Sequence, residues 1–202
     1  MHLPRSLNHL IEKQIILGSA SPRRAELLSG LGILFEIRIS GAEETVPEGL
    51  PPIEYVSYLS ELKANTLKST LRENEILITA DTIVCINDTI LNKPKDKLEA
   101  SKMLKELSGM EHKVITGITC TTTKGMISDA DTARVQIIKM DEDEILFYID
   151  KYNPMDKAGA YGIQEWFGLA MIRSIIGSYY TIMGLPSHKL YHMLKHDIKS
   201  IL

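Results

Sequence analysis

Two long segments rich in β-branched residues, 112–123 and 126–140, are separated by only Lys124 and Gly125. β-branched residues favour strands, and two strands joined by so short a connection pair in the antiparallel direction. A purely parallel sheet is therefore excluded. The hairpin restricts the chain to folds in which at least part of the sheet is antiparallel.

Segments typical of helices alternate with further strand-like segments along the rest of the chain. The expected strands cover 14–18, 35–40, 89–91 and 169–176, together with a strand over 76–80 and 83–86 that is interrupted or flanked by Asp81-Thr82. The expected helices cover 22 to about 30 or 32, 55–67, 97–107, 145–152 and 187 to about 198. Asp96 and Asp141 each precede a Glu by three residues, which is the signature of a capping box, and Asn87-Asp88 predicts a tight turn. This alternation predicts an α/β fold with a mixed, twisted sheet flanked by helices.

The composition is that of an ordinary globular protein. With 44% hydrophobic and 24% charged residues, the 202 residues suffice for one sizeable domain, which we expect to span 1–202. The net charge of -3, from 23 basic and 26 acidic residues, gives no general attraction for a phosphate backbone. A nucleic-acid polymer is therefore not an expected partner, whereas a small anion remains compatible with a local group of cations.

Neither a membrane anchor nor a disulfide framework is expected. The longest apolar run near the N-terminus is Ile15-Ile16-Leu17, which is too short for a signal peptide core or a membrane span. We therefore expect a cytoplasmic protein without a membrane partner. Cys85 and Cys120 are 35 positions apart and are predicted to be reduced core thiols, and His112 is predicted to be packed rather than catalytic.

The motif Ser19-Ala20-Ser21-Pro22-Arg23-Arg24 lies where an expected strand runs into an expected helix. Ser21 can cap that helix, and Pro22 suits its first position. The free N–H groups of a helix start attract phosphate, and guanidinium groups bind phosphate oxygens bidentately. Because cations oppose the helix dipole there, the motif predicts a phosphate site; a solvated basic turn is the alternative.

Asp81 places a carboxylate inside an otherwise apolar strand, between Ile78 and Val84. An unpaired buried charge is strongly destabilising, so Asp81 needs a cation. That cation is either a buried Arg or a divalent metal, for which Asp81 would serve as ligand and water-activating base. The Glu43-Glu44 pair on the loop after residues 35–40 can supply a second oxygen ligand, or it is simply solvated.

Two further candidate site segments are Lys93 and residues 156–164. Lys93 follows the Asp81 strand and precedes the rigid Pro94, so it can reach back toward Asp81, although most lysines only solvate a surface. The segment from Asp156 to Gln164 combines two glycines with polar side chains that can bind a base or a ribose. A plain structural loop is the alternative for this segment.

Taken together, these motifs resemble the Maf family of nucleoside triphosphate pyrophosphatases from about Ile15 to Leu194. The resemblance rests on Ser-x-Ser-Pro-Arg-Arg at 19–24, Glu-Glu at 43–44, Ala-Asp-Thr at 80–82, Lys-Pro at 93–94, Asp-Lys-Ala-Gly-Ala-Tyr-Gly-Ile-Gln at 156–164 and Gly-Leu-Pro at 184–186. Two positions depart from the family pattern: Asn92, where many members have Gly, and Asn153, where an acidic residue is common. Neither departure removes an expected ligand.

The resemblance implies two lobes around a central cleft, as in Maf and inosine-triphosphatase-like proteins, and a homodimer. It also implies hydrolysis of a nucleoside triphosphate to the monophosphate and pyrophosphate with Mg²⁺ or Mn²⁺ as cofactor, which removes unwanted or modified nucleotides. By family role, the catalytic residues are Asp81, Glu44 and Lys93, and the metal ligands are Asp81 and Glu44, where motif register selects Glu44 over Glu43. The substrate-binding residues by the same resemblance are Ser19, Arg23, Arg24, Lys63, Thr82 and Gln164.

The nucleobase expected is thymine or uracil. Thr82, Arg24 and Gln164 resemble the set found in the dTTP/UTP subgroup. The Gln164 amide also offers both a donor and an acceptor to the edge of thymine or uracil, whereas a carboxylate would favour a donor-rich edge such as that of 7-methylguanine. The alternatives are a Maf-type pyrophosphatase for 7-methyl-GTP or another modified nucleotide, a non-catalytic nucleotide-binding regulator of septum formation, and a sugar-nucleotide or phosphate-ester enzyme.

Overall fold

The computed structural model describes residues 4–87 and 89–202, and the chain divides into two compact units. Unit 1 comprises the residues up to Asp81 together with Thr116–Asp131 and Gly184–Leu202, and unit 2 comprises Thr82–Ile115 and Thr132–Met183. Three long strands, β3 (Glu75–Ile86), β5 (Glu111–Thr121) and β6 (Met126–Ile137), contribute residues to both units. The expectations of one domain over 1–202 and of a central cleft stay predictions.

The strands form a mixed sheet in the order β2-β1-β3-β5-β6-β7, with β4 paired to β3. β1 (Gln14–Leu17) is parallel to β2 (Phe35–Ile37) and to β3, while β4 (Thr89–Leu91) is antiparallel to β3 and β7 (Ile172–Ile176) is antiparallel to β6. The two segments of the predicted hairpin, β5 and β6, are neighbours in this order. The predicted fold class, a mixed sheet flanked by helices, is confirmed.

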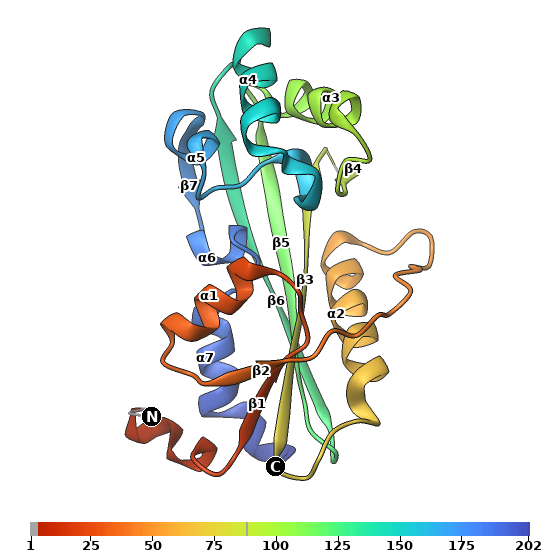
Figure 1. The fold of residues 1–202 in the computed structure, drawn as a ribbon, viewed down its shortest axis with the longest axis vertical. Helices are drawn as coiled ribbons and strands as arrows, with labels where there is room; N and C mark the ends of the chain where they lie inside the picture. Colours follow the sequence, from red (N-terminus) through yellow and green to blue (C-terminus); the bar gives the residue numbers. More distant parts are fainter. Residues whose placement is uncertain (1–3, 88) are drawn as a thin grey trace. The chain divides into compact units, whose positions relative to one another are not determined.

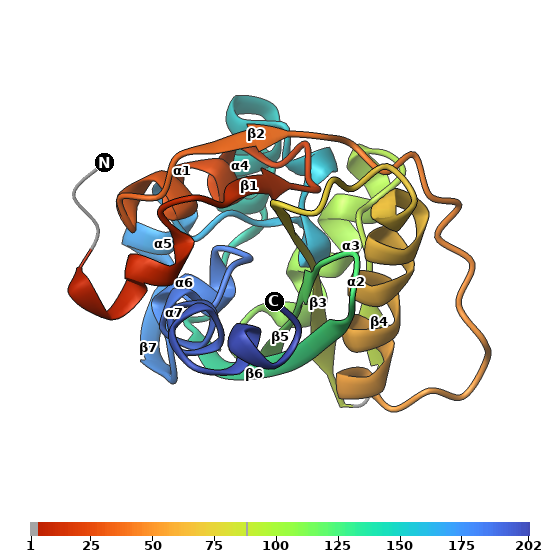
Figure 2. The ribbon, with the colours of Figure 1, turned by 90° about the horizontal axis from the view of Figure 1, so that it is seen from below.

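In unit 1, helices cover both faces of the strands because alternate side chains point to opposite faces. Ile15 and Ile78 face the core that includes Leu28 of α1 (Pro22–Gly30) and Leu190 of α7 (Ser187–Lys195). Ile16 and Leu77 face the other way, toward Ala64 and Leu67 of α2 (Pro52–Lys68). Figure 2 shows α2 on one side of β3 and α7 on the other. The short helices η1 (Arg5–Leu10) and η4 (Asp197–Ser200) complete this unit.

In unit 2, α3 (Lys97–Leu107), α4 (Glu142–Tyr152) and α5 (Trp166–Ala170) pack on one apolar core with Val84, Val114 and Val135 of the three long strands. Figure 1 shows α3 and α4 next to each other. Both predicted caps are present: the Asp96 side chain accepts from the Glu99 N–H at 2.8 Å, and α4 begins with a reciprocal capping box. The remaining elements are η2 (Pro154–Asp156), η3 (Ala158–Ala160) and α6 (Tyr179–Ile182).

Several predicted boundaries are wrong. β3 continues unbroken through Asp81 and Thr82, and the strand expected over 169–176 starts at Ile172 because α5 occupies the residues before it. β2 ends at Ile37 rather than at residue 40. Ser21 is the N-cap residue of α1, but its side chain makes no capping hydrogen bond, and α7 ends at Lys195 rather than near residue 198.

The predictions for the two cysteines and for the turn at Asn87 can be compared with the structure. Cys85 and Cys120 are both buried and neither forms a disulfide, as predicted, and burial raises the pKa of the Cys120 thiol to about 12. In the predicted turn, Asn87 has a φ of 47°, and Asp88 lies outside the described residues.

No helix within residues 4–87 and 89–202 is both long enough and apolar enough to cross a lipid bilayer.

Candidate active site

Three charged side chains of unit 1 meet at the ammonium group of Lys63. Lys63 Nζ lies 2.5 Å from Asp81 Oδ1 and 3.0 Å from Glu44 Oε1. The side chains of Lys63 and Asp81 are 11% and 12% exposed, whereas that of Glu44 is 45% exposed. In the structure the cation beside Asp81 is therefore Lys63, a partner other than the predicted buried Arg, while a divalent metal stays a prediction. Glu44, the glutamate selected by motif register, is the one that joins this pair.

The packing of α2 against β3 brings Lys63 to Asp81. Lys63 belongs to the buried stripe of α2 that also contains Val56, Leu59 and Leu67, at spacings of three and four residues. The Thr79 hydroxyl donates to the Ser60 carbonyl at 2.7 Å, which places the β3 face that bears Thr79 against this stripe. Asp81 lies two residues further on and shares that face. The position of Lys63 in the apolar stripe is the sequence signal that could have identified the pairing.

Ser19 and Arg24 form a second polar cluster in unit 1. Ser19 Oγ accepts from the Ser21 N–H at 3.2 Å and from Arg24 Nη1 at 3.1 Å, while Arg24 Nε donates to the Gly184 carbonyl at 2.8 Å. Burial lowers the pKa of Arg24, and the charge of Asp81 acts against this effect. Arginine stays protonated in either case. The motifs at 19–24 and 184–186 thus fix one guanidinium within electrostatic reach of the Asp81 carboxylate.

The carboxylates of Asp81 and Glu44 fit part of the coordination shell of a divalent cation. Both approach the same positive group, so each has an oxygen directed at a shared point. Mg²⁺ is commonly held by one or two carboxylates, with substrate phosphate oxygens and water completing the shell. Within the described part of the chain, no group of three or more His, Cys, Asp or Glu side chains is arranged to hold a metal ion.

Of the remaining predicted site residues, Arg23 lies in α1 of unit 1 and is half-buried, and the other three belong to unit 2. Thr82 follows Asp81 in β3 and is half-buried, and both Lys93 and Gln164 are exposed. The Gly159 N–H donates to the Asn92 carbonyl at 3.2 Å, so the structure ties the segment that carries Lys93 to the segment that carries Gln164. A backbone carbonyl can make this contact from any residue, so the family departure at Asn92 does not affect it.

His112 is packed, as predicted. Its Nε2 lies 2.8 Å from the Tyr161 hydroxyl, and the two rings meet edge to face. The side chain is buried, and this burial lowers the pKa of His112 to about 4. His112 is therefore neutral at pH 7 and anchors the loop that contains Tyr161.

Replacing His112 with Gln should remove part of the acid sensitivity of the fold. Because the folded-state pKa is about 4 and the ordinary value is 6.5, the unfolded chain binds more protons between these pH values. The contribution of this group to the free energy of unfolding is therefore fully present above pH 6.5. It decreases by about 3 kcal/mol as the pH falls toward 4. Urea unfolding of wild type and His112→Gln across this range measures the difference. Parallel pH profiles for the two proteins would show that His112 does not contribute.

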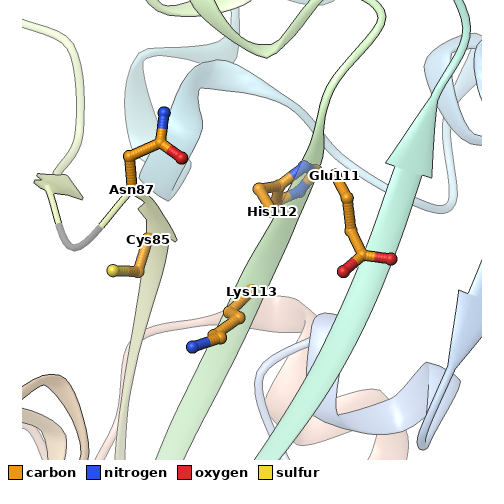
Figure 3. Close-up of a pocket in the computed structure, with 5 residues that line it drawn as sticks. All are labelled: Cys85, Asn87, Glu111, His112 and Lys113. Carbon is orange, nitrogen blue, oxygen red and sulfur yellow. The ribbon is translucent and has the colours of Figure 1, made fainter.

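Unit 2 also contains a pocket of about 270 Å³ (Figure 3). Its lining comes from two segments, the end of β3 and the start of β5. The lining residues are Cys85, Asn87, Glu111, His112 and Lys113. None of the predicted catalytic, metal or substrate-binding residues is among them.

Comparison with known proteins identifies the family. The family model described as Maf-like protein matches residues 14–197. The chain belongs to the Maf family. The match includes every residue of the Ser19–Arg24, Asp81 and Gln164 motifs, as the sequence resemblance indicated.

Curated Maf-family relatives match nearly the whole chain. A protein of Bacteroides thetaiotaomicron, named dTTP/UTP pyrophosphatase, is 47% identical over 190 residues, which are 94% of this chain and 98% of the relative. A protein of Flavobacterium johnsoniae with the same name is 44% identical over 181 residues, or 90% and 93% of the two chains. Among solved structures, the match to the Staphylococcus aureus Ham1 protein covers 62% of this chain and 72% of that chain, at 15% sequence identity. The TM-score of this match is 0.45.

Proposed function

We propose that this Maf-family chain is a nucleoside triphosphate pyrophosphatase that hydrolyses dTTP and UTP to the monophosphate and pyrophosphate. The observation that carries the proposal is the buried Asp81–Lys63 pair with Glu44 beside it. In this proposal Asp81 is the catalytic carboxylate, and Lys63 is the neighbouring cation that binds phosphate. The names of the relatives at 47% and 44% identity support the choice of reaction and of substrate.

The phosphate groups are held by cations and hydroxyls of the motifs. In this proposal Ser19, Arg23 and Lys63 bind phosphate oxygens, and the free N–H groups at the start of α1 add a favourable dipole. Lys93 binds the leaving pyrophosphate and offsets the charge that develops on it. A triphosphate carries about four negative charges at neutral pH, so several cations are needed to bind it.

Asp81 acts as the base in the hydrolytic step. It accepts a proton from a water molecule, whose oxygen forms a bond to the α-phosphorus while the bond from that phosphorus to the bridging oxygen breaks. Both electrons of the broken bond leave with pyrophosphate, so no covalent enzyme intermediate is needed. Asp81 and Glu44 would hold a Mg²⁺ or Mn²⁺ ion, which supplies positive charge to the phosphates and lowers the pKa of a bound water.

Base selection is proposed to depend on Gln164, with Thr82 and Arg24 as further members of the specificity set. The Gln164 amide can accept from N3–H of thymine or uracil and donate to a neighbouring carbonyl oxygen. Cytosine reverses part of this pattern. An amide can also flip, so CTP is disfavoured only moderately.

The substrate ranking tests the proposed function. With Mg²⁺ or Mn²⁺ present, we expect dTTP and UTP to release pyrophosphate with a kcat/KM about tenfold above that of GTP or 7-methyl-GTP. Gln164→Glu should reduce this preference, because a carboxylate has no donor. The assay follows pyrophosphate and orthophosphate separately. Preference for 7-methyl-GTP, orthophosphate as the product, or binding without turnover would each contradict the proposal and support one of the alternatives named above.

The proposal also covers the cellular location, the oligomeric state and the partners of the enzyme. We place the enzyme in the cytoplasm as a homodimer that acts on small nucleotides, without a nucleic-acid or membrane partner. The net charge of -3 supports the exclusion of a nucleic-acid polymer, and the family resemblance supports the dimer.

A further inference from the structure

One tyrosine hydroxyl holds both ends of the turn that carries Gln164. The Glu165 N–H donates to the Gly162 carbonyl at 3.2 Å and closes a four-residue turn, Gly162 to Glu165. The Gly162 N–H donates to the Tyr148 hydroxyl oxygen at 2.9 Å, and the same hydroxyl donates to the Glu165 carboxylate. Tyr148 thus uses its donor at one end of the turn and an acceptor at the other.

The Tyr148 hydroxyl is itself held in a fixed position. Its side chain is fully buried on α4, and its ring packs against Phe167 and Tyr152 with centroids 5.2 Å from each. The helix begins with the capping box of Asp141 and ends at Asn153 in a left-handed conformation. Burial, and next the hydrogen bond to Glu165, raise the pKa of Tyr148, so the hydroxyl remains a proton donor.

Glu165, the other partner of this hydroxyl, is held by an ion pair with the buried Lys157. Lys157 Nζ lies 3.1 Å from Glu165 Oε1 and 2.8 Å from Asp156 Oδ1, and the Lys157 side chain is 9% exposed. Gly162 packs directly on this pair: a Cβ at that position would lie 2.8 Å from Glu165 Cδ and 3.0 Å from Lys157 Cε. A larger residue at 162 would therefore force the ends of the Glu165 and Lys157 side chains to shift.

The turn also packs against α5, which leaves Gln164 as its exposed residue. Gly162 and Ile163 are buried and Glu165 is half-buried, whereas Gln164 is exposed. A Cβ on Gly168 would lie only 1.7 Å from the Ile163 carbonyl oxygen, so α5 approaches the turn as closely as the backbone permits. The backbone on both sides of Gln164 is therefore fixed while its side chain faces solvent.

We propose that Tyr148, held with Glu165 and Lys157, positions Gln164 and thereby sets which nucleobase this enzyme accepts. This inference rests on the proposed function, in which Gln164 binds the base. An amide discriminates between bases only when its donor and acceptor are held against a matching edge, and a loosened turn lets it rotate to suit other bases. Tyr148 is a positioning residue, since it acts through Gln164 and not on the substrate.

The test is a double-mutant cycle between Tyr148→Phe and Gln164→Ala, with kcat and KM measured for dTTP, UTP, CTP and GTP. Tyr148→Phe should raise KM for dTTP by about tenfold, leave kcat within about twofold and reduce the preference for dTTP over GTP by about tenfold. In the Gln164→Ala background, the same substitution should change that preference by less than about twofold.

Two further variants separate positioning from general stability. Tyr152→Phe removes a hydroxyl from the same helix, on a ring stacked against Tyr148, and should leave both KM and base preference unchanged. Glu165→Gln weakens the pair with Lys157 but keeps an oxygen that can accept from Tyr148, so it should lower the preference by a smaller factor than Tyr148→Phe. Thermal melting of each variant verifies that it is folded before the kinetics are compared.

The outcomes distinguish this inference from the proposed function. A wild-type enzyme with no preference among the four triphosphates would overturn both. A wild-type preference that Tyr148→Phe leaves intact, or a Tyr148→Phe effect of equal size with and without Gln164, would overturn the positioning role alone. If Tyr148→Phe fails to fold, an unchanged preference in Glu165→Gln would overturn it.

Discussion

Asp81→Asn is expected to lower pyrophosphate release from dTTP by at least about a hundredfold. The amide keeps the shape of the side chain but cannot accept the proton of the attacking water. It also withdraws a negative charge from the proposed metal ligands. The Asn oxygen can still accept a hydrogen bond from Lys63, whose distance to Asp81 is 2.5 Å in the wild type. The variant should therefore fold and melt within about 5 °C of the wild type.

A matched control for this substitution is Asp129→Asn in the same unit. Asp129 also pairs with a lysine, Lys189 at 2.9 Å, but its side chain is 43% exposed. Pyrophosphate release should be unchanged in this variant, because an exposed ion pair contributes little and Asp129 has no proposed role in catalysis. Near-normal turnover by Asp81→Asn would remove Asp81 from the mechanism.

Lys63→Met is expected to lower both activity and stability. Methionine fills similar space but leaves the Asp81 carboxylate buried without its ion-pair partner, which should reduce the free energy of unfolding by about 3 kcal/mol. Loss of a cation from the phosphate site should also reduce kcat/KM for dTTP by about a hundredfold. Urea denaturation and steady-state kinetics measure the two effects separately.

The double variant Lys63→Met with Asp81→Asn decides whether the two residues are coupled. Once the carboxylate is also removed, most of the lost stability should return, because no uncompensated charge remains buried. As a control, Lys97→Met breaks an exposed pair with Asp150 and should cost at most about 0.5 kcal/mol. A double variant no more stable than Lys63→Met would show that Lys63 is not the cation on which Asp81 depends.

Local sequence patterns were sufficient to predict most helices, most strands and the candidate residues. Capping signals such as Asp96 and the Asp141 box depend on residues three positions apart, and strand patterns depend on neighbours two positions apart. The presence of antiparallel strands in the sheet likewise follows from short connections. The sequence also contains the motifs that assign Asp81, Glu44 and Gln164 to the family pattern. The roles of these three residues in the reaction stay predictions.

The partners of the buried groups depended on tertiary structure. Lys63 and Asp81 are 18 positions apart, on a helix and a strand, and no local rule specifies which face of α2 meets which face of β3. The same contact explains why β3 is continuous where an interruption was expected, since a charge neutralised by Lys63 need not leave the sheet. Similarly, residues 169 and 170, which were expected to begin a strand, belong to α5, in a region where Gly168 fits against Ile163. The sequence by itself determined most of the elements, through short-range periodicity, and the candidate site residues, through their motifs. Only the packing of distant segments decided which charges are paired and which turn is fixed.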